Sequence, residues 1–236
     1  MRKTILSMIF LSTIIGLSAQ TKITGFGKLK LGDSISIVNG MGYDVETVTK
    51  DNDYFSKVYK NSRATKIYEL VADSTEERPV TGSSLDLRVR VFAAPKYSVT
   101  DNIEIKSVQL KFFKNRLIEI NCDGDSKLEE ALTLKYGEPK KNLKEKENKF
   151  TYTYTGNTVT KTDQTFTSEW TTNDKNISCT SVLSKWHSSK GEANYLSYIN
   201  LADNSHNEDI RKTEEAVKER LKNRELLKKK ESLNGF

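Results

Sequence analysis

The sequence has little of the residues on which several classes of protein depend. Its 236 residues include 2 Cys, 3 Pro and 12 Gly, which excludes a collagen-like chain, a disulfide-rich scaffold and a cysteine-rich zinc protein. Histidine is equally scarce, because His187 and His206 are the only two. Most metal sites and many hydrolytic sites depend on histidine. We therefore expect neither a metal nor a cofactor.

A large excess of one charge is also missing. The chain has 38 Lys and Arg residues against 32 Asp and Glu residues, a formal net charge of +6. A dedicated nucleic-acid-binding protein gathers its cations on one face with few acids between them, and the mixed charges of this chain do not follow that pattern. We expect no nucleic-acid partner. The hydrophobic share of 36% suffices for the core of a soluble protein.

The N-terminus has the layout of a secretory signal peptide. Arg2 and Lys3 precede an apolar run over residues 5–17, and Ala19 ends a small-residue cleavage site. The run is shorter than the roughly 20 residues of a membrane span; an uncleaved signal anchor is the alternative. We predict that residues 1–19 are removed and that the remaining chain is exported, to the periplasm or outside the cell, with no membrane span.

The first half of the chain begins with one short helix, and strands follow. Asp33 and Ser34 offer capping oxygens before a helix over 35–41, which Gly42 ends. Alternating apolar residues predict four strands, over 66–72, 85–92, 103–113 and 117–122. In the strand over 103–113 the apolar phase changes at Ser107, which predicts a β-bulge there.

The second half repeats this order. Ser126 and Glu129 have the spacing of a capping box for a helix that Gly137 and Pro139 end. The charged segment over 140–149 is interpreted as a connector. Four more strands are predicted, over 150–155, 165–171, 177–185 and 194–202.

The last segment, residues 208–231, has the pattern of a charged helix with a thin apolar stripe. We therefore predict an α+β fold of two similar units, each a helix packed on a four-stranded antiparallel sheet, followed by this helix. The predicted boundaries are 1–19 for the signal peptide, 20–125 for the first unit, 126–206 for the second, and 207–236 for the C-terminal helix and tail.

Two segments give this order a family resemblance. Residues 31–34, Leu-Gly-Asp-Ser, open the first predicted helix, and residues 134–139, Leu-Lys-Tyr-Gly-Glu-Pro, close the second. In these helix ends the chain resembles, in architecture, the tandem helix-plus-four-strand domains of the beta-lactamase-inhibitor-protein-like family. The resemblance implies an exported protein that binds other proteins through a sheet face and loops, without chemistry of its own. The resemblance assigns an inhibitory role to no residue of this chain.

The two cysteines allow two interpretations. Cys122 is in phase with Ile118 and Ile120, and Cys179 with Ile177, so both side chains are expected in a core. Export places them in an oxidising compartment, where an even number of cysteines favours a disulfide between Cys122 and Cys179. The alternative is a pair of separate buried thiols, each packed as a small hydrophobic residue.

Two polar segments are interpreted as recognition loops, since exposed loops on a rigid sheet are frequent binding sites. Residues 73–84 include Arg78, and residues 93–102 include Lys96 and Tyr97. We take these three side chains as candidate binding residues. The aromatic residues of the second half could form a flat binding face or fill the core between helix and sheet. These residues are Tyr152, Tyr154, Trp170, Trp186, Tyr195 and Tyr198.

The sequence contains no recognisable catalytic constellation. His187 and Ser188 are adjacent in a segment with the composition of an exposed turn. The basic residues between Lys222 and Lys230 suit an anionic surface, but Glu225 interrupts them. We therefore predict an exported, non-enzymatic binding protein with a protein partner of unknown identity, in an oligomeric state that the sequence leaves open. The alternative is a hydrolase acting on envelope polymers through carboxylates that the sequence does not pair.

Overall fold

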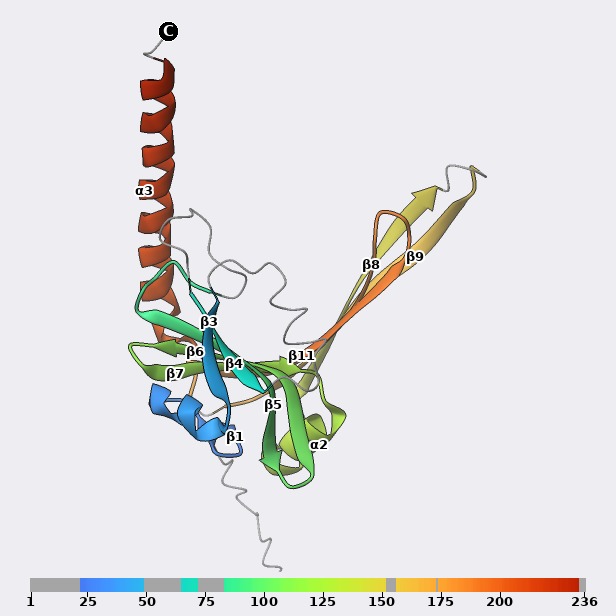
Figure 1. Cartoon of the computed structure of the whole chain (residues 1–236). Coiled ribbons are helices and arrows are strands. Elements are labelled where there is room, and N and C mark those ends of the chain that lie inside the picture. Colours follow the sequence, from blue (N-terminus) through green and yellow to red (C-terminus); the bar gives the residue numbers. More distant parts are fainter. Residues whose placement is uncertain (1–21, 49–64, 72–82, 152–155, 173, 234–236) are drawn as a thin grey trace, which may run out of the picture.

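One mixed β-sheet forms the centre of the computed structural model (Figure 1), which describes residues 22–48, 65–71, 83–151, 156–172 and 174–233. Its nine strands lie in the order β3-β4-β5-β6-β7-β11-β10-β9-β8. Neighbouring strands are antiparallel except β3 and β4, which are parallel. The strands are β3 (Asp44–Val48), β4 (Lys66–Leu70), β5 (Val89–Thr100), β6 (Ile103–Phe113), β7 (Arg116–Asp123), β8 (Lys140–Thr151), β9 (Thr158–Trp170), β10 (Ile177–His187) and β11 (Ala193–Asp203).

Smaller elements accompany this sheet. β1 (Gly25–Phe26) and β2 (Leu29–Lys30) form a separate two-stranded sheet. The 3-10 helix η1 (Ile35–Met41) confirms the first predicted helix, and α3 (Asn207–Leu233) confirms the charged C-terminal helix. The remaining helices are α2 (Ser126–Tyr136) and η2 (Asn204–His206).

The prediction of two helix-plus-sheet units is wrong, because one sheet continues across the predicted boundary after residue 125. β7, from the first predicted unit, pairs with β11, from the second. Cys122 lies opposite Ile199, and Ile120 lies opposite Leu201. Apolar alternation identifies strands and their faces, but it does not say which strand lies beside which. The pairing that joins the two halves therefore has no signal in the sequence.

The charged segment that was interpreted as a connector is a strand. β8 pairs with β9 along its whole length, from Lys140 opposite Glu169 to Thr151 opposite Thr158. It forms one edge of the sheet, and most of its side chains are exposed. An edge strand with two exposed faces lacks the apolar alternation that predicts a strand. Its many lysines oppose edge-to-edge pairing with another chain.

The strand predicted over 85–92 begins only at Val89. Asp86 is 1% exposed, and its carboxylate accepts a hydrogen bond from the backbone N–H of Arg88 at 2.9 Å. Such side-chain bonds to the backbone compete with strand pairing. β5 continues instead to Thr100, through the residues that were interpreted as a recognition loop.

The bulge predicted at Ser107 is replaced by a single residue with left-handed backbone. The φ angle of Ser107 is 53°, and Ile105 and Val108 on either side of it are both fully buried. The pairing of β6 with β5 keeps its register there, with Ala94 opposite Val108. The buried side chains therefore change phase along β6 because the backbone twists at Ser107, without the additional residue that a β-bulge would insert.

α2 begins where predicted. Its sequence favours Asp123, Asp125 and Ser126 as turn and N-cap residues, and Asp125 takes the N-cap position. The N-cap is Asp125, whose carboxylate accepts a hydrogen bond from the backbone N–H of Leu128 at 2.9 Å. Glu129 does not close a capping box, because its carboxylate accepts a hydrogen bond from the hydroxyl of Ser181 on β10. Gly137 ends the helix as predicted.

The sheet has a hydrophobic core on each face, since alternate residues of β5 belong to different clusters. The larger core lies on the face that packs against α2, here called the α2 face, and includes Leu128, Leu132 and Tyr136 of that helix. The smaller core lies on the other face and includes Ile210, by which α3 docks.

Beyond these cores, the far ends of four strands extend away from the body as an arm (Figure 1). In these described ranges no residue as a whole is buried. A sheet usually covers at least one face with a core, so this arm is unusual in having two open faces. It consists of residues 143–151 of β8, 158–166 of β9, 183–187 of β10 and 193–197 of β11.

Candidate binding surface

Three apolar side chains form a row across the base of the arm. Leu143 lies opposite Phe166, and Phe166 lies opposite Leu183. Their exposed fractions are 46%, 45% and 48%. Residues directly opposite one another on neighbouring strands have their side chains on the same face. Leu143, Phe166 and Leu183, here called the apolar row, therefore form one surface across three strands.

The apolar row lies on the α2 face, between the larger core and a polar rim. Trp170, four residues from Phe166 along β9, is 2% exposed and belongs to that core. In the other direction, a two-residue step of about 6.8 Å leads to Gln164. Its amide donates a hydrogen bond to Glu145 at 2.7 Å, and it lies opposite Lys185. The row therefore continues the core surface outward until it meets charged residues.

A groove of about 310 Å³ lies between α2 and the base of the row. The core side of α2 is packed on the sheet, so the helix presents its other side to this groove. Leu134 on that side is 81% exposed. Ser168 lies two residues from Phe166 on the same face, so the groove and the row are continuous. The groove is lined by residues that include Glu129, Glu130, Leu134, Glu138, Lys141, Ser168 and Trp170.

Trp170 brings an unused hydrogen-bond donor to the wall of the groove. Its indole Nε1 is buried and has no hydrogen-bond partner in the part of the chain that the structure describes. A buried donor without a partner costs on the order of 1–3 kcal/mol.

The surroundings of the groove and the row are acidic, although the whole chain has a net charge of +6. Four carboxylates and two ammonium groups lie there. This excess of negative charge favours a cationic ligand over an anionic one. The carboxylates are those of Glu129, Glu130, Glu138 and Glu145, and the ammonium groups are those of Lys141 and Lys185.

The binding residues predicted from the sequence lie elsewhere. Lys96 and Tyr97 belong to β5 and not to a loop. Lys96 pairs with Glu104 at 3.0 Å, and this hydrogen bond raises the pKa of the lysine. The hydroxyl of Tyr97 accepts a hydrogen bond from the backbone N–H of Lys28 at 3.1 Å. Successive strand residues point to opposite faces, so Lys96 and Tyr97 do not form one site. Arg78 lies outside the described residues.

Sequence reasoning missed the apolar row. Leu143 lies in the segment that was interpreted as a connector, and Phe166 and Leu183 lie on separate predicted strands. Leu143 and Phe166 are each an apolar residue between polar neighbours, which is the one signal that the sequence offers. Their meeting depends on strand register, which the sequence does not reveal. Of the aromatic residues in the second half of the chain, Trp170 is buried, whereas Tyr195 is 67% exposed.

The candidate disulfide is not formed, because Cys122 and Cys179 are both free, buried thiols. β11 lies between their strands, with Cys122 opposite Ile199 and Cys179 opposite Leu201. Neighbouring strands are about 4.8 Å apart, so two strand spacings exceed the Cα separation of about 4.4–6.8 Å that a disulfide spans. Desolvation raises the pKa of each thiol to about 12. The structure therefore agrees with the second of the two interpretations of the cysteines, in which each is a separate buried thiol.

His187 lies at the end of β10, and its side chain is 7% exposed, so it is not in the exposed turn that the sequence predicts. Its Nδ1 lies 2.8 Å from Oδ1 of Asp163, and its backbone N–H donates to the same oxygen at 2.9 Å. Asn148 donates to the other carboxylate oxygen at 2.6 Å. The bond with the His187 side chain contributes most to holding the pKa of Asp163 below its ordinary value. This cluster joins β8, β9 and β10 within the arm.

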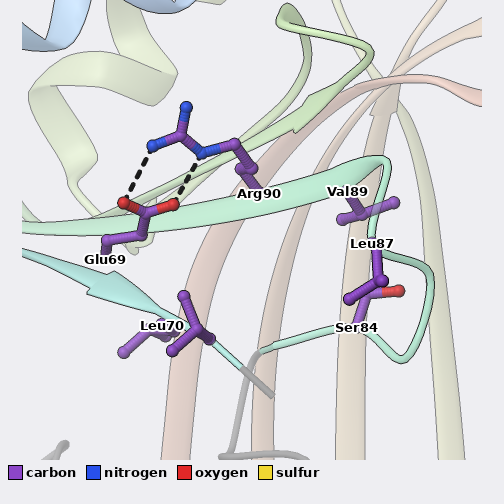
Figure 2. A pocket seen from close by; sticks show the side chains of 7 residues that line it. Glu69, Leu70, Ser84, Leu87, Val89 and Arg90 are labelled. Atoms are coloured by element: carbon purple, nitrogen blue, oxygen red, sulfur yellow. Dashed lines mark hydrogen bonds and ion pairs between the residues drawn. The ribbon is translucent and has the colours of Figure 1, made fainter. Parts of the chain in front are cut away.

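A second pocket, of about 230 Å³, lies beside β4 and β5, far along the sheet from the arm. Figure 2 shows its wall, with Leu70, Leu87 and Val89 beside the ion pair of Glu69 and Arg90. Arg90 donates two hydrogen bonds to Glu69, at 2.6 and 2.9 Å, and these raise the pKa of Arg90. The two charges satisfy each other, so neither is available to a ligand without breaking this pair.

The described ranges contain no group of three or more His, Cys, Asp or Glu side chains placed to hold a metal ion. None of the helices within them combines the length and the apolar character that a membrane crossing requires.

Comparison of the chain with protein-family models, with curated proteins and with solved structures gave no match. The resemblance to the beta-lactamase-inhibitor-protein-like family therefore stays a prediction.

Proposed function

We propose that this protein is an exported, non-enzymatic binding protein that recognises another protein through the apolar row and the adjoining groove. The apolar row carries the proposal, since Leu143, Phe166 and Leu183 lie together and are each nearly half exposed. An exposed apolar patch rimmed by polar residues is typical of a protein-binding surface. The exported location rests on the signal-peptide pattern of residues 1–19, which lie outside the described residues.

Phe166 is the expected centre of the contact. Across the strands it lies between Leu143 and Leu183, and along β9 it lies between Ser168 at the groove and Gln164 at the polar rim. Aromatic side chains at the centre of an interface, surrounded by residues that exclude water, are frequent hot spots. The acidic side chains that line the groove then add polar contacts that select among partners.

A display library of random linear peptides tests the proposal even while the partner is unidentified. The library is selected on the purified protein, and enriched peptides are titrated against three forms of it: the unchanged protein, Phe166→Ser and Leu87→Ser. Leu87 is a matched control, because it is 89% exposed and lies in the pocket beside β5. We expect Phe166→Ser to weaken binding at least about tenfold and Leu87→Ser to leave it unchanged.

The melting temperature of each variant is measured alongside. Phe166 is nearly half exposed, so its substitution should leave the fold intact, and a loss of binding then reports the surface itself. The proposal is overturned if no peptide is enriched, or if the enriched peptides bind the Phe166→Ser variant as well as the unchanged protein.

A further inference from the structure

Among the residues that the structure describes, nothing covers the outer part of α3, residues 222–232. Every described side chain from Lys222 to Ser232 is exposed. The inner part of the helix, in contrast, is fastened to the sheet by buried Ile210 and by the hydrogen bonds of Arg88 to Asp209. Short polar helices are marginal in water when nothing packs against them.

This outer part combines two apolar residues with a concentration of cations. Leu226 and Leu227 are adjacent and are 47% and 60% exposed. Five cations and two anions lie between residues 222 and 232, a net charge of 5 − 2 = +3. The cations are Lys222, Arg224, Lys228, Lys229 and Lys230, and the anions are Glu225 and Glu231. An apolar centre within a cationic surround is the complement of the apolar row within its acidic surround.

We infer that the outer part of α3 of one copy binds the groove and the apolar row of a second copy. The inference rests on the binding role proposed above for that surface. Leu226 and Leu227 would bury the exposed side of the row, while the cations would face Glu130, Glu138 and Glu145. Helices commonly bind in apolar grooves in this way.

The contact fits two copies better than one. Within a single copy, α3 rises from the side of the sheet away from the arm (Figure 1), and both the helix end and the row are exposed. The two contacting surfaces are different, so the contact is heterologous: the copy that gives its helix end keeps a free groove, and the copy that gives its groove keeps a free helix end. The assembly therefore either closes into a ring or grows with protein concentration.

Charge reversal at each surface tests the inference by sedimentation analysis over a range of concentrations. The groove variant is Glu130→Lys with Glu138→Lys, and the helix variant is Lys228→Glu with Lys229→Glu. The helix variant changes the net charge of the outer part from +3 to 3 − 4 = −1, and the groove variant places two lysines opposite the cations of the helix. Each variant alone therefore loses the charge complementarity, and we expect its self-association to be about tenfold weaker than that of the unchanged protein. Raising the salt concentration should weaken the association of the unchanged protein.

Mixing the two variants is the decisive measurement. In the mixture, the cationic groove of one variant meets the anionic helix of the other, and the unchanged groove meets the unchanged helix. Both contacts are complementary again, so we expect association to return to that of the unchanged protein. A matched control is Lys218→Glu with Arg220→Glu, which reverses two charges on the inner part of the same helix and should have little effect.

The outcomes separate this inference from the proposed function. An unchanged protein that stays monomeric at every concentration overturns the inference, and so does a mixture that associates no better than either variant alone. If peptides still bind through Phe166 in those cases, the proposed function stands. If the mixture recovers association but no peptide binds through Phe166, the surface serves contacts between copies, and recognition of a different protein is not supported.

Discussion

Arg88, in the turn just before β5, and Asp209, in the first turn of α3, are joined by two hydrogen bonds of 3.0 Å each. The same guanidinium donates to Asp86 at 2.7 Å. The carboxylate of Asp86 is 2% exposed, whereas that of Asp209 is 53% exposed. Arg88 therefore joins a buried charge on the sheet to the base of the helix, and it holds α3 in place together with buried Ile210.

Arg88→Ala should destabilise the protein more than Asp209→Ala. Loss of Arg88 leaves the buried carboxylate of Asp86 without its cation, which is costly, whereas loss of Asp209 removes only the exposed partner. We expect the melting temperature to fall by roughly 5 °C or more for Arg88→Ala and by less than half of that for Asp209→Ala. Arg220→Ala, at an exposed position on the same helix, serves as the control. Equal effects of the first two variants would contradict this account.

Asp86 should also make stability depend on pH in acid. Burial raises its pKa, but the hydrogen bonds from Arg88 lower it more, so the pKa lies below the ordinary value of 3.8. A carboxyl group with a lower pKa in the folded state stabilises the fold above its unfolded pKa, and this contribution is lost as the pH falls through the folded value. Asp86→Asn should therefore destabilise the protein near neutral pH, and its difference from the unchanged protein should shrink below pH 3.8.

Chemical denaturation at a series of pH values measures this difference. Asp101→Asn, at an exposed turn position, is the control and should show no such convergence. A difference between Asp86→Asn and the unchanged protein that stays constant down to strong acid would count against the ion pair as its cause.

Local signals in the sequence predict much of the secondary structure. The helix at Ile35–Met41 and the strand at Ile103–Phe113 have the predicted bounds. In both, the signal is local, because capping residues, glycine and apolar alternation act within a few residues of one another. The cap of α2 shows the limit, since Ser126 and Asp125 both have suitable side chains and the structure uses Asp125.

Local sequence signals do not predict the order of the strands or the presence of an edge strand. The pairing of Cys122 with Ile199 joins segments that the sequence assigns to different units. Leu143 lies in a strand whose charged residues give no alternation, because both faces of that strand are open to water. The apolar row depends on both of these features, so the candidate site is visible only once the register of β8, β9 and β10 is known.

The cluster around Asp163 should stabilise the arm separately from the body of the sheet. Asp163 accepts hydrogen bonds from both the ring and the backbone of His187 and from Asn148. Asp163→Ala removes all three of these bonds, whereas His187→Ala removes only the one from the ring and keeps those from the backbone and from Asn148. We therefore expect faster amide exchange in residues 140–151 and 158–165 for both variants, with the larger effect for Asp163→Ala.

Exchange in β6 and β7, which lie outside the arm, is the internal control and should not change. An equal acceleration throughout the sheet would mean that the cluster supports the whole fold and not the arm alone.

The export component of the proposal predicts the N-terminus of the protein in its host. Cleavage after Ala19 leaves Gln20 as the first residue, and mass spectrometry of the native protein can identify that residue. Ala19→Arg should block cleavage, because the position before the cut requires a small side chain. A native protein that retains residues 1–19 would contradict a cleaved signal peptide and favour the signal anchor.

The two cysteines should remain reduced and unreactive in the folded protein, even after export. Both are buried, β11 separates their strands, and desolvation raises the pKa of each thiol to about 12. Only the thiolate reacts rapidly with alkylating agents, so Cys122 and Cys179 should resist iodoacetamide in the native state and react fully in denaturant. Mass spectrometry without reductant should give the mass of the dithiol form. The mass of a disulfide form would show that the strand order between β7 and β10 is wrong, because the two Cα atoms could approach closely enough only if β11 did not lie between them.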